Sequence, residues 1–182
     1  VSFTHFAKAF HELSGMTYGI IGLGNIGRRV ADIAKAFGCR VIYYSTSGRN
    51  SQPGYERVSF DELLEQSDIV SIHAPLDENT LGLMNKEAFA KMKKSAILLN
   101  VGRGPIINEA DLAEALNNKT IAAAGLDVLS VEPMQEDNPL RGIKDSERLL
   151  ITPHIAWAGV EARNRLMGII LGQIKEFFKA HE

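Results

Sequence analysis

Short apolar runs alternate along the chain with segments whose apolar residues recur at helical spacing. The runs are rich in β-branched and aromatic residues and cover 17–21, 39–44, 68–73, 96–101, 121–128 and 149–152. Near-continuous apolar strands of this kind are typical of a parallel sheet that helices cover on both faces. The alternation therefore predicts the α/β class, with residues 1–182 forming one doubly wound parallel sheet.

The first predicted helix follows a glycine-rich turn and ends at Gly38, which suits a helix C-terminus. We expect one apolar face of this helix to be buried against the sheet. The residues of that face are Ile26, Val30, Ile33 and Phe37.

Capping residues locate three more helices. Ser59 with Glu62 forms a capping-box pattern, and another helix spans 85–94. Asn108 begins the next helix. Its expected buried residues are Ala110, Leu112, Ala113 and Leu116.

The last helix, predicted over 160–180, carries a wide apolar stripe. We expect this stripe to pack against the sheet, and the alternative is that it serves a partner. Gly168 and Gly172 would allow close packing on either side. The stripe consists of Leu166, Ile169, Ile170, Ile174, Phe177 and Phe178.

The glycine-rich turn lies between the first strand and the first helix. Gly22, Gly24 and Gly27 have the G-x-G-x-x-G spacing, which provides a tight turn, close approach of a pyrophosphate and close helix–strand packing. The N–H groups of the helix start, at Asn25 and Ile26, would hold the phosphates. Because both flanks match, the motif predicts a dinucleotide-binding domain of the Rossmann type.

Composition narrows the class of ligand. The formal net charge of −2 gives no general attraction to nucleic acid or to anionic membranes, and no apolar run is long enough to span a bilayer. The single cysteine, Cys39, favours a reducing, cytoplasmic location. His5 and His11 do not share a helical face, so we expect no metal site.

The end of the second strand bears on the choice of cofactor. Dinucleotide folds that prefer NAD usually place Asp or Glu there. This chain has Tyr44-Ser45-Thr46-Ser47-Gly48-Arg49-Asn50, without an acid. The hydroxyls of Ser45 and Ser47 and the cation of Arg49 suit a 2′-phosphate, which favours NADP over NAD. Alternatively, this is a polar turn that tolerates either cofactor.

Polar groups also follow the later strands. His73-Ala74-Pro75 should wall the nucleotide crevice, and Arg103 follows the strand that ends near Asn100. Asp127 and Glu132 follow the next strand, and His154 follows the last. Because carboxyl ends of parallel strands share one edge, these groups should lie together where a cofactor binds.

With these motifs in place, the chain resembles the coenzyme-binding domain of the D-isomer-specific 2-hydroxyacid dehydrogenases, and in 154–158 the glycerate dehydrogenase (hydroxypyruvate reductase) branch. The resemblance implies a catalytic set of Arg103, Glu132 and His154, a place for Asp127 near the nicotinamide, and a homodimer formed through this domain. The motifs are Gly22-Leu23-Gly24-Asn25-Ile26-Gly27, His73-Ala74-Pro75-Leu76, Asn100-Val101-Gly102-Arg103-Gly104, Gly125-Leu126-Asp127-Val128, Glu132-Pro133 and Thr152-Pro153-His154-Ile155-Ala156. Together with Ser45, Ser47 and Arg49 of the turn after the second strand, the predicted NAD(P) contacts are Gly22, Gly24, Asn25, Ile26, Gly27, His73, Ala74, Pro75, Thr80, Asn100, Val101, Gly102, Asp127 and His154.

The resemblance also implies a reaction, in which hydride passes between the nicotinamide and a 2-oxo or 2-hydroxy acid substrate. His154 would protonate the developing alkoxide, Glu132 would orient the imidazole and favour its charged form, and Arg103 would bind the substrate carboxylate.

Two departures from the family keep alternatives open. The usual acid after the second strand is missing, and family members are about twice as long, with a substrate-binding domain that we expect to be absent from this chain. An oxidoreductase domain is the leading hypothesis. The alternatives are a dinucleotide-sensing module similar to the C-terminal-binding-protein corepressors, or a fragment that binds cofactor without turnover.

Overall fold

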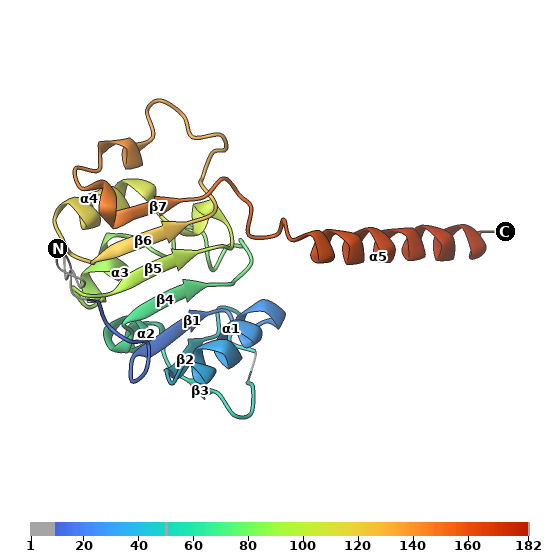
Figure 1. Ribbon diagram of the computed structural model, residues 1–182, viewed down its shortest axis with the longest axis horizontal. Coiled ribbons are helices and arrows are strands. Elements are labelled where there is room, and N and C mark those ends of the chain that lie inside the picture. The colour runs from blue at the N-terminus through green and yellow to red at the C-terminus, as the bar shows by residue number, and fades with distance from the viewer. Residues whose placement is uncertain (1–9, 50, 182) are drawn as a thin grey trace, which may run out of the picture.

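The computed structural model of the protein describes residues 10–49 and 51–181, and in it a single sheet runs through the body of the molecule (Figure 1). The sheet has seven strands in the order β3-β2-β1-β4-β5-β6-β7, and every pairing is parallel. This confirms the doubly wound α/β prediction; the two-residue edge strand β3 was not predicted. The strands are β1 Thr17–Ile21, β2 Arg40–Tyr44, β3 Glu56–Arg57, β4 Ile69–Ile72, β5 Ile97–Asn100, β6 Ala123–Leu126 and β7 Leu149–Ile151.

The helices begin largely where the capping residues predicted. The side chain of Ser59 accepts from the backbone N–H of Glu62, completing a capping box, and Asn85 and Asn108 cap α3 and α4 through their side-chain oxygens. The α-helices are α1 Asn25–Ala36, α2 Phe60–Gln66, α3 Lys86–Lys91, α4 Glu109–Asn117 and α5 Val160–Lys179, and the 3₁₀ helices are η1 Gly104–Ile106, η2 Pro139–Gly142 and η3 Ser146–Arg148.

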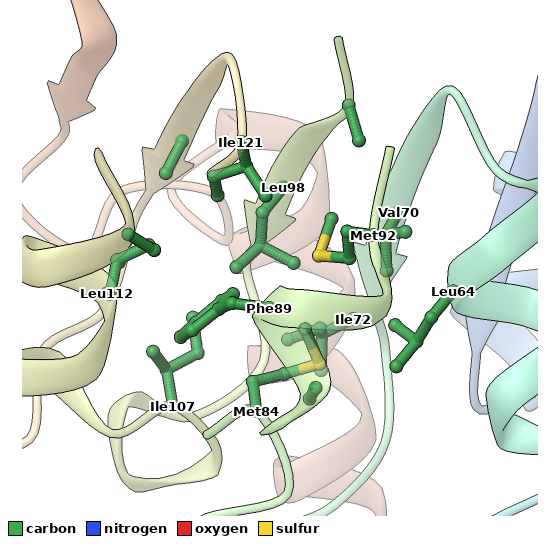
Figure 2. Close-up of a cluster of buried hydrophobic side chains, with 14 of the residues drawn as sticks. Leu64, Val70, Ile72, Met84, Phe89, Met92, Leu98, Ile107, Leu112 and Ile121 are labelled. Carbon is green, nitrogen blue, oxygen red and sulfur yellow. The ribbon is translucent and has the colours of Figure 1, made fainter. Parts of the chain in front are cut away.

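The larger core lies between one face of the sheet and helices α2, α3 and α4. Phe89 of α3 is at its centre, and Leu112 of α4 and Leu98 of β5 are fully buried around it (Figure 2). The expected buried side of α4 needs one correction, because Ala110 is exposed and Ala115 is buried in its place. The cap at Asn108 sets the phase of the helix, and residue 110 then lies on the solvent side of the first turn.

The buried face of α1 differs from the one the sequence predicted. Ile26, Ile33 and Phe37 are exposed, whereas Val30 is half-buried and packs as predicted. The fully buried residues of the helix are small: Gly27, Ala31 and Ala34. A Cβ atom on Gly27 would lie 2.2 Å from the carbonyl oxygen of Gly22, so the helix sits too close to β1 for larger side chains. Because α1 lies so close to β1, its buried face is shifted by one residue, about 100° around the helix axis, from the predicted face.

On the face that carries α1, the sheet is covered unevenly. Helix α1 contacts β1 and β2, and a smaller core with Ile20, Val41 and Tyr43 lies beneath it. Over β5 and β7 the expected two-sided cover is wrong for the residues described, because Ile97 and Leu150 are exposed. An apolar groove runs there; its lining includes Tyr18, Val30, Leu99 and Leu150.

Helix α5 projects away from the sheet (Figure 1), and none of its 20 residues is buried. The expectation that its apolar stripe packs against this sheet is wrong. The connection after β7 leads the chain off the edge of the sheet before the helix starts at Val160, so its apolar side chains stay exposed among the residues that the structure describes. Within 10–49 and 51–181, no helix is long and apolar enough to cross a membrane. His5 lies outside the described residues.

Candidate active site

The strand register brings the polar residues to one edge of the sheet. Ile21 pairs with Ile72, Ile72 with Asn100, Asn100 with Leu126, and Leu126 with Ile151, so the carboxyl ends of the central strands are level. The turns that follow these strands therefore open on the same side. They carry Gly22, Ser45, His73, Arg103, Asp127 and His154.

The glycine turn has the geometry that a dinucleotide requires. Gly22 has φ +90°, and a Cβ atom on it would lie 2.8 Å from the backbone of Ala74. A Cβ atom on Gly24 would meet nothing within 4 Å, so open space adjoins this residue. Helix α1 starts at Asn25 with no side chain capping its first turn. The turn thus leaves backbone N–H groups and room for a diphosphate, and the observed residues fit the predicted cofactor.

Ser45 supplies a second sign of a ligand beside this turn. Its side chain is buried, and its Oγ atom has no hydrogen-bond partner among the residues described. The crevice in front of it is also lined by Gly22, Gly24, Ser47 and Pro75. A buried hydroxyl without a partner is costly, and a polar ligand in the crevice would satisfy it.

Asn100 shapes the turn that presents Arg103. Its Oδ1 accepts from the N–H of Gly102 at 3.0 Å, and its Nδ2 donates to the carbonyl of Arg103 at 3.0 Å. The Asn100 side chain is fully buried, so these bonds hold the turn from inside. The guanidinium of Arg103 remains exposed, with Nη1 donating to the Gly102 carbonyl at 2.8 Å. Predicted as a cofactor contact, Asn100 is thus placed as a scaffold of the arginine turn.

Glu132 and His154 form a pair. The carboxylate Oε2 lies 2.7 Å from Nδ1 of His154, and Oε1 accepts from the backbone N–H of Leu129 at 2.9 Å. The Leu129 N–H, and after it the bond from His154, hold the pKa of Glu132 below its ordinary value. With Nδ1 engaged by a carboxylate, Nε2 is the ring nitrogen left to exchange a proton with a substrate.

Asp127 holds the loop that carries His154. Its carboxylate accepts from the hydroxyl of Thr152 and from the N–H groups of Ile155 and Ala156, at 2.9 and 2.8 Å for the latter two. Burial of Asp127 raises its pKa, but the Thr152 hydroxyl and the two N–H groups outweigh it, and the pKa is lowered overall. The carboxylate of Asp127, which was predicted to lie near the nicotinamide, therefore bonds to the loop that carries His154.

The backbone of that loop is unusual at His154 itself. His154 has φ +53°, a conformation that side-chain-bearing residues rarely adopt. The indole Nε1–H of Trp157 donates to the His154 carbonyl at 2.8 Å. Bonds on both sides of the strained residue thus fix the direction of its ring.

One cleft of about 350 Å³ joins the two predicted sets of residues. Arg103 and His154 both line it, together with Ile26 at the start of α1, so the arginine and the imidazole face the same space. Glu132 approaches His154 from a neighbouring pocket that it shares with Pro133 and Met134. Val30, Ala156 and Trp157 also line the cleft and were not predicted from the sequence. The position of Trp157, three residues after His154, was the available signal for it.

The remaining predicted contacts line the cleft, are buried beside it, or are exposed. His73, Val101 and Gly102 line the cleft; burial lowers the pKa of His73 to about 4, and its Nε2 lies 2.8 Å from the Ser71 hydroxyl. Thr80, in contrast, is buried, and its hydroxyl donates to the carbonyl of Pro75 at 2.7 Å. Ala74 is buried against Gly22, and Arg49 is exposed at the far end of the crevice turn. Among the residues described, no group of three or more His, Cys, Asp or Glu side chains is placed to hold a metal ion.

Known proteins are similar to this chain over most of its length. The chain is 48% identical over 173 residues to a hydroxypyruvate reductase of Blautia hydrogenotrophica and 45% identical over 158 residues to a glyoxylate reductase of Aeropyrum pernix. These alignments cover 92% and 85% of this chain but 52% and 46% of the relatives, so the chain spans about half their length.

Solved structures show the same fold. A D-lactate dehydrogenase from Aquifex aeolicus, complexed with NAD and lactic acid, superposes with a TM-score of 0.86 at 28% identity, covering 96% of this chain and 58% of that one. An acyclic imino acid reductase in complex with NADPH and D-Arg gives 0.88 at 33% identity, covering 99% and 56%. The model of the D-isomer specific 2-hydroxyacid dehydrogenase NAD-binding domain matches residues 3–156, and the chain therefore belongs to that family.

Proposed function

We propose that this chain is the cofactor-binding and proton-transferring part of a D-2-hydroxyacid dehydrogenase. The observation that carries the proposal is the shared cleft, in which Arg103 and the Glu132-bonded His154 face the space beside the glycine turn. When bound, a nicotinamide dinucleotide held by Gly22, Gly24 and the N–H groups at the start of α1 would supply the hydride. The relatives named hydroxypyruvate reductase and glyoxylate reductase indicate small 2-oxo acids as the substrate class.

The chain's own residues then have distinct tasks. Arg103 binds the substrate carboxylate through parallel hydrogen bonds and draws charge from the adjacent carbonyl. His154, protonated and held through Nδ1 by Glu132, gives the proton on Nε2 to the oxygen that becomes a hydroxyl. In the reverse direction the same nitrogen accepts the proton. Asp127 keeps the loop in the conformation that aims the ring.

Turnover by the complete protein tests the catalytic assignment. We expect His154→Asn to lower kcat for hydroxypyruvate or glyoxylate reduction by about 10²-fold or more, because the proton donor is lost. The exposed His11→Asn is the matched control and should leave kcat unchanged. Near-normal turnover of His154→Asn would remove His154 from this role. Dinucleotide binding by the wild type without reduction of any 2-oxo acid would favour the sensing module instead.

For the choice of cofactor, we propose a preference for NADP. The turn after β2 has no acidic side chain, and it offers the unpartnered Ser45 hydroxyl, Ser47 and the exposed Arg49 to a 2′-phosphate. Calorimetric titration of the 182-residue chain with NADPH and NADH tests this directly. Arg49→Ala should weaken NADPH binding by about tenfold and leave NADH binding unchanged, because one charge-assisted contact is worth about 1.4 kcal/mol. Tighter binding of NADH by the wild type contradicts the proposal.

We also propose that the complete protein closes the cleft with a second, substrate-binding domain and assembles as a homodimer. The length of the relatives supports the first point. The apolar residues exposed on α1 and α5 support the second, since apolar surface of this extent usually marks an interface. Light scattering should give twice the chain mass at micromolar concentration, and a monomer at high concentration contradicts it. A cytoplasmic location remains a prediction from the single cysteine.

A further inference from the structure

A carboxylate outside the predicted site bridges the segment that carries Glu132. Glu109, the first residue of α4, accepts from the backbone N–H of Ser130 at 2.7 Å through Oε1. Its Oε2 accepts from Nδ2 of Asn138 at 2.8 Å. Ser130 comes two residues before Glu132 and Asn138 six residues after it. The Glu109 side chain thus bonds to both ends of the 130–138 segment, which contains Glu132.

The bridge joins that segment to the chain that carries Arg103. Glu109 comes six positions after Arg103, and the turn between them packs tightly: a Cβ atom on Gly104 would lie 2.0 Å from the carbonyl of Leu129. The backbone after β5 and the backbone after β6 are therefore in direct contact at Gly104, and Glu109 adds two hydrogen bonds beside that contact.

Two successive backbone N–H groups bond to two different glutamates. The N–H of Leu129 donates to Glu132, and the N–H of the next residue, Ser130, donates to Glu109. Glu109 therefore holds the peptide group directly after the one that bonds to the Glu132 carboxylate. Oε2 of Glu132 in turn lies 2.7 Å from Nδ1 of His154. At the far end, Asn138 is buried and its Oδ1 accepts from the N–H of Leu140, so its amide cannot turn over without losing that bond.

We propose that Glu109 is a positioning residue for the proton-transfer pair, acting through the 129–138 segment to set the Glu132 carboxylate against His154. The proposal rests on the proposed function for its catalytic meaning, while its structural content stands on the contacts of Glu109. A purely structural role, as an acidic residue in the first turn of α4, would affect the helix and leave Glu132 alone.

The Glu109→Gln variant tests this in the 182-residue chain, without any need for turnover. Its amide can still accept from Ser130 but presents an N–H group to the Nδ2 of Asn138, so the bridge is broken at one end. We expect the pKa of Glu132, followed by carbon-13 NMR of its carboxyl group, to rise towards that of an ordinary glutamate, because its bond from Leu129 loosens. The matched control is Glu114→Gln on the same helix, whose carboxylate pairs with Lys86 at the surface, and it should leave the Glu132 titration unchanged.

A second variant, Asn138→Ala, removes the far end of the bridge and should move the Glu132 titration in the same direction. In the complete protein, Glu109→Gln should lower kcat by about tenfold with cofactor affinity unchanged, because the ring is less well aimed. If either variant loses stability while the Glu132 titration stays where it was, Glu109 is structural only and the proposal is overturned. If the titration moves but His154→Asn does not affect turnover, the positioning stands and the proposed function fails.

Discussion

The two halves of the cleft are built in different ways. On the cofactor side, the backbone itself makes the site: Gly22 and Gly27 are selected by close contacts, and Gly24 leaves open space. On the proton-transfer side, side chains hold the conformation of the backbone. Asn100 bonds to the turn that directly follows it, whereas Asp127 and Glu109 bond to turns that are distant from them in sequence. A backbone site depends on a few glycines, whereas a side-chain site depends on buried carboxylates and amides that keep their partners.

The largest effect is expected where the backbone approach is tightest. Gly27→Val places side-chain atoms where even a Cβ lies 2.2 Å from the Gly22 carbonyl oxygen, so α1 must move away from β1. We expect the free energy of unfolding to fall by about 3 kcal/mol or more, since overpacking at a backbone contact has no flexible neighbour to absorb it. Urea denaturation followed by circular dichroism measures this. Full stability of the variant would show that α1 does not need this close contact.

The next largest effect should come from the side-chain half. Asp127→Asn replaces one acceptor oxygen by a donor, leaving at least one of the Thr152, Ile155 and Ala156 donors without its partner. The expected loss is about 2 kcal/mol, as for a buried bond to a charged group.

Asp137→Asn, at an exposed carboxylate of the neighbouring segment, serves as the control for this substitution. It should change stability by less than about 0.5 kcal/mol. Equal losses in the two variants would mean that Asp127 does not hold the histidine loop.

A smaller effect on stability depends on pH and comes from the side chain of His73. Its folded pKa of about 4 lies below the value of 6.5 expected when unfolded, so between these values the unfolded chain binds more protons. Stability present above pH 6.5 is therefore lost as the pH falls towards 4. The shift corresponds to at most about 3 kcal/mol, and partial exposure of the ring reduces the expected loss to about 1.5 kcal/mol.

The measurement is the free energy of unfolding at pH 7 and pH 4.5 for the wild type and for His73→Gln, which cannot titrate. The wild type should lose more stability than the variant over this interval. Equal losses would show that His73 is not the group responsible.

The smallest effect on stability is expected at Gly24. Its φ of −78° suits any residue and a Cβ meets nothing within 4 Å, so Gly24→Ala should reduce the free energy of unfolding by only about 0.5 kcal/mol, the difference at a helix N-cap. Dinucleotide affinity should nevertheless fall by about tenfold or more, because the methyl group enters the space left for the diphosphate. Fluorescence titration with NADH measures this, and unchanged affinity would place the diphosphate elsewhere.

The comparison of the halves also explains what could be predicted. The glycine turn, the capping residues Ser59 and Asn108, and the alternation of strands and helices that marks the α/β class were all recognisable, because each depends on neighbours in sequence. The candidate residues Arg103, Glu132 and His154 could be named from their positions after strands. That Nδ1 of His154 meets Glu132 could be inferred only through the family resemblance, and the bridge made by Glu109 could not be inferred at all.

The amino-acid sequence by itself determined the periodicity, the turn and the polar residues at the strand ends, since local sterics and alternation of apolar positions specify them. Tertiary structure decided which face of α1 is buried, because the backbone of α1 approaches that of Gly22 too closely at Gly27 for any side chain there. It likewise decided that α5 leaves the sheet, and that Asp127 bonds to a loop 28 residues further along the chain. Such choices depend on which surfaces come into contact, and that is a property of the whole fold rather than of any segment.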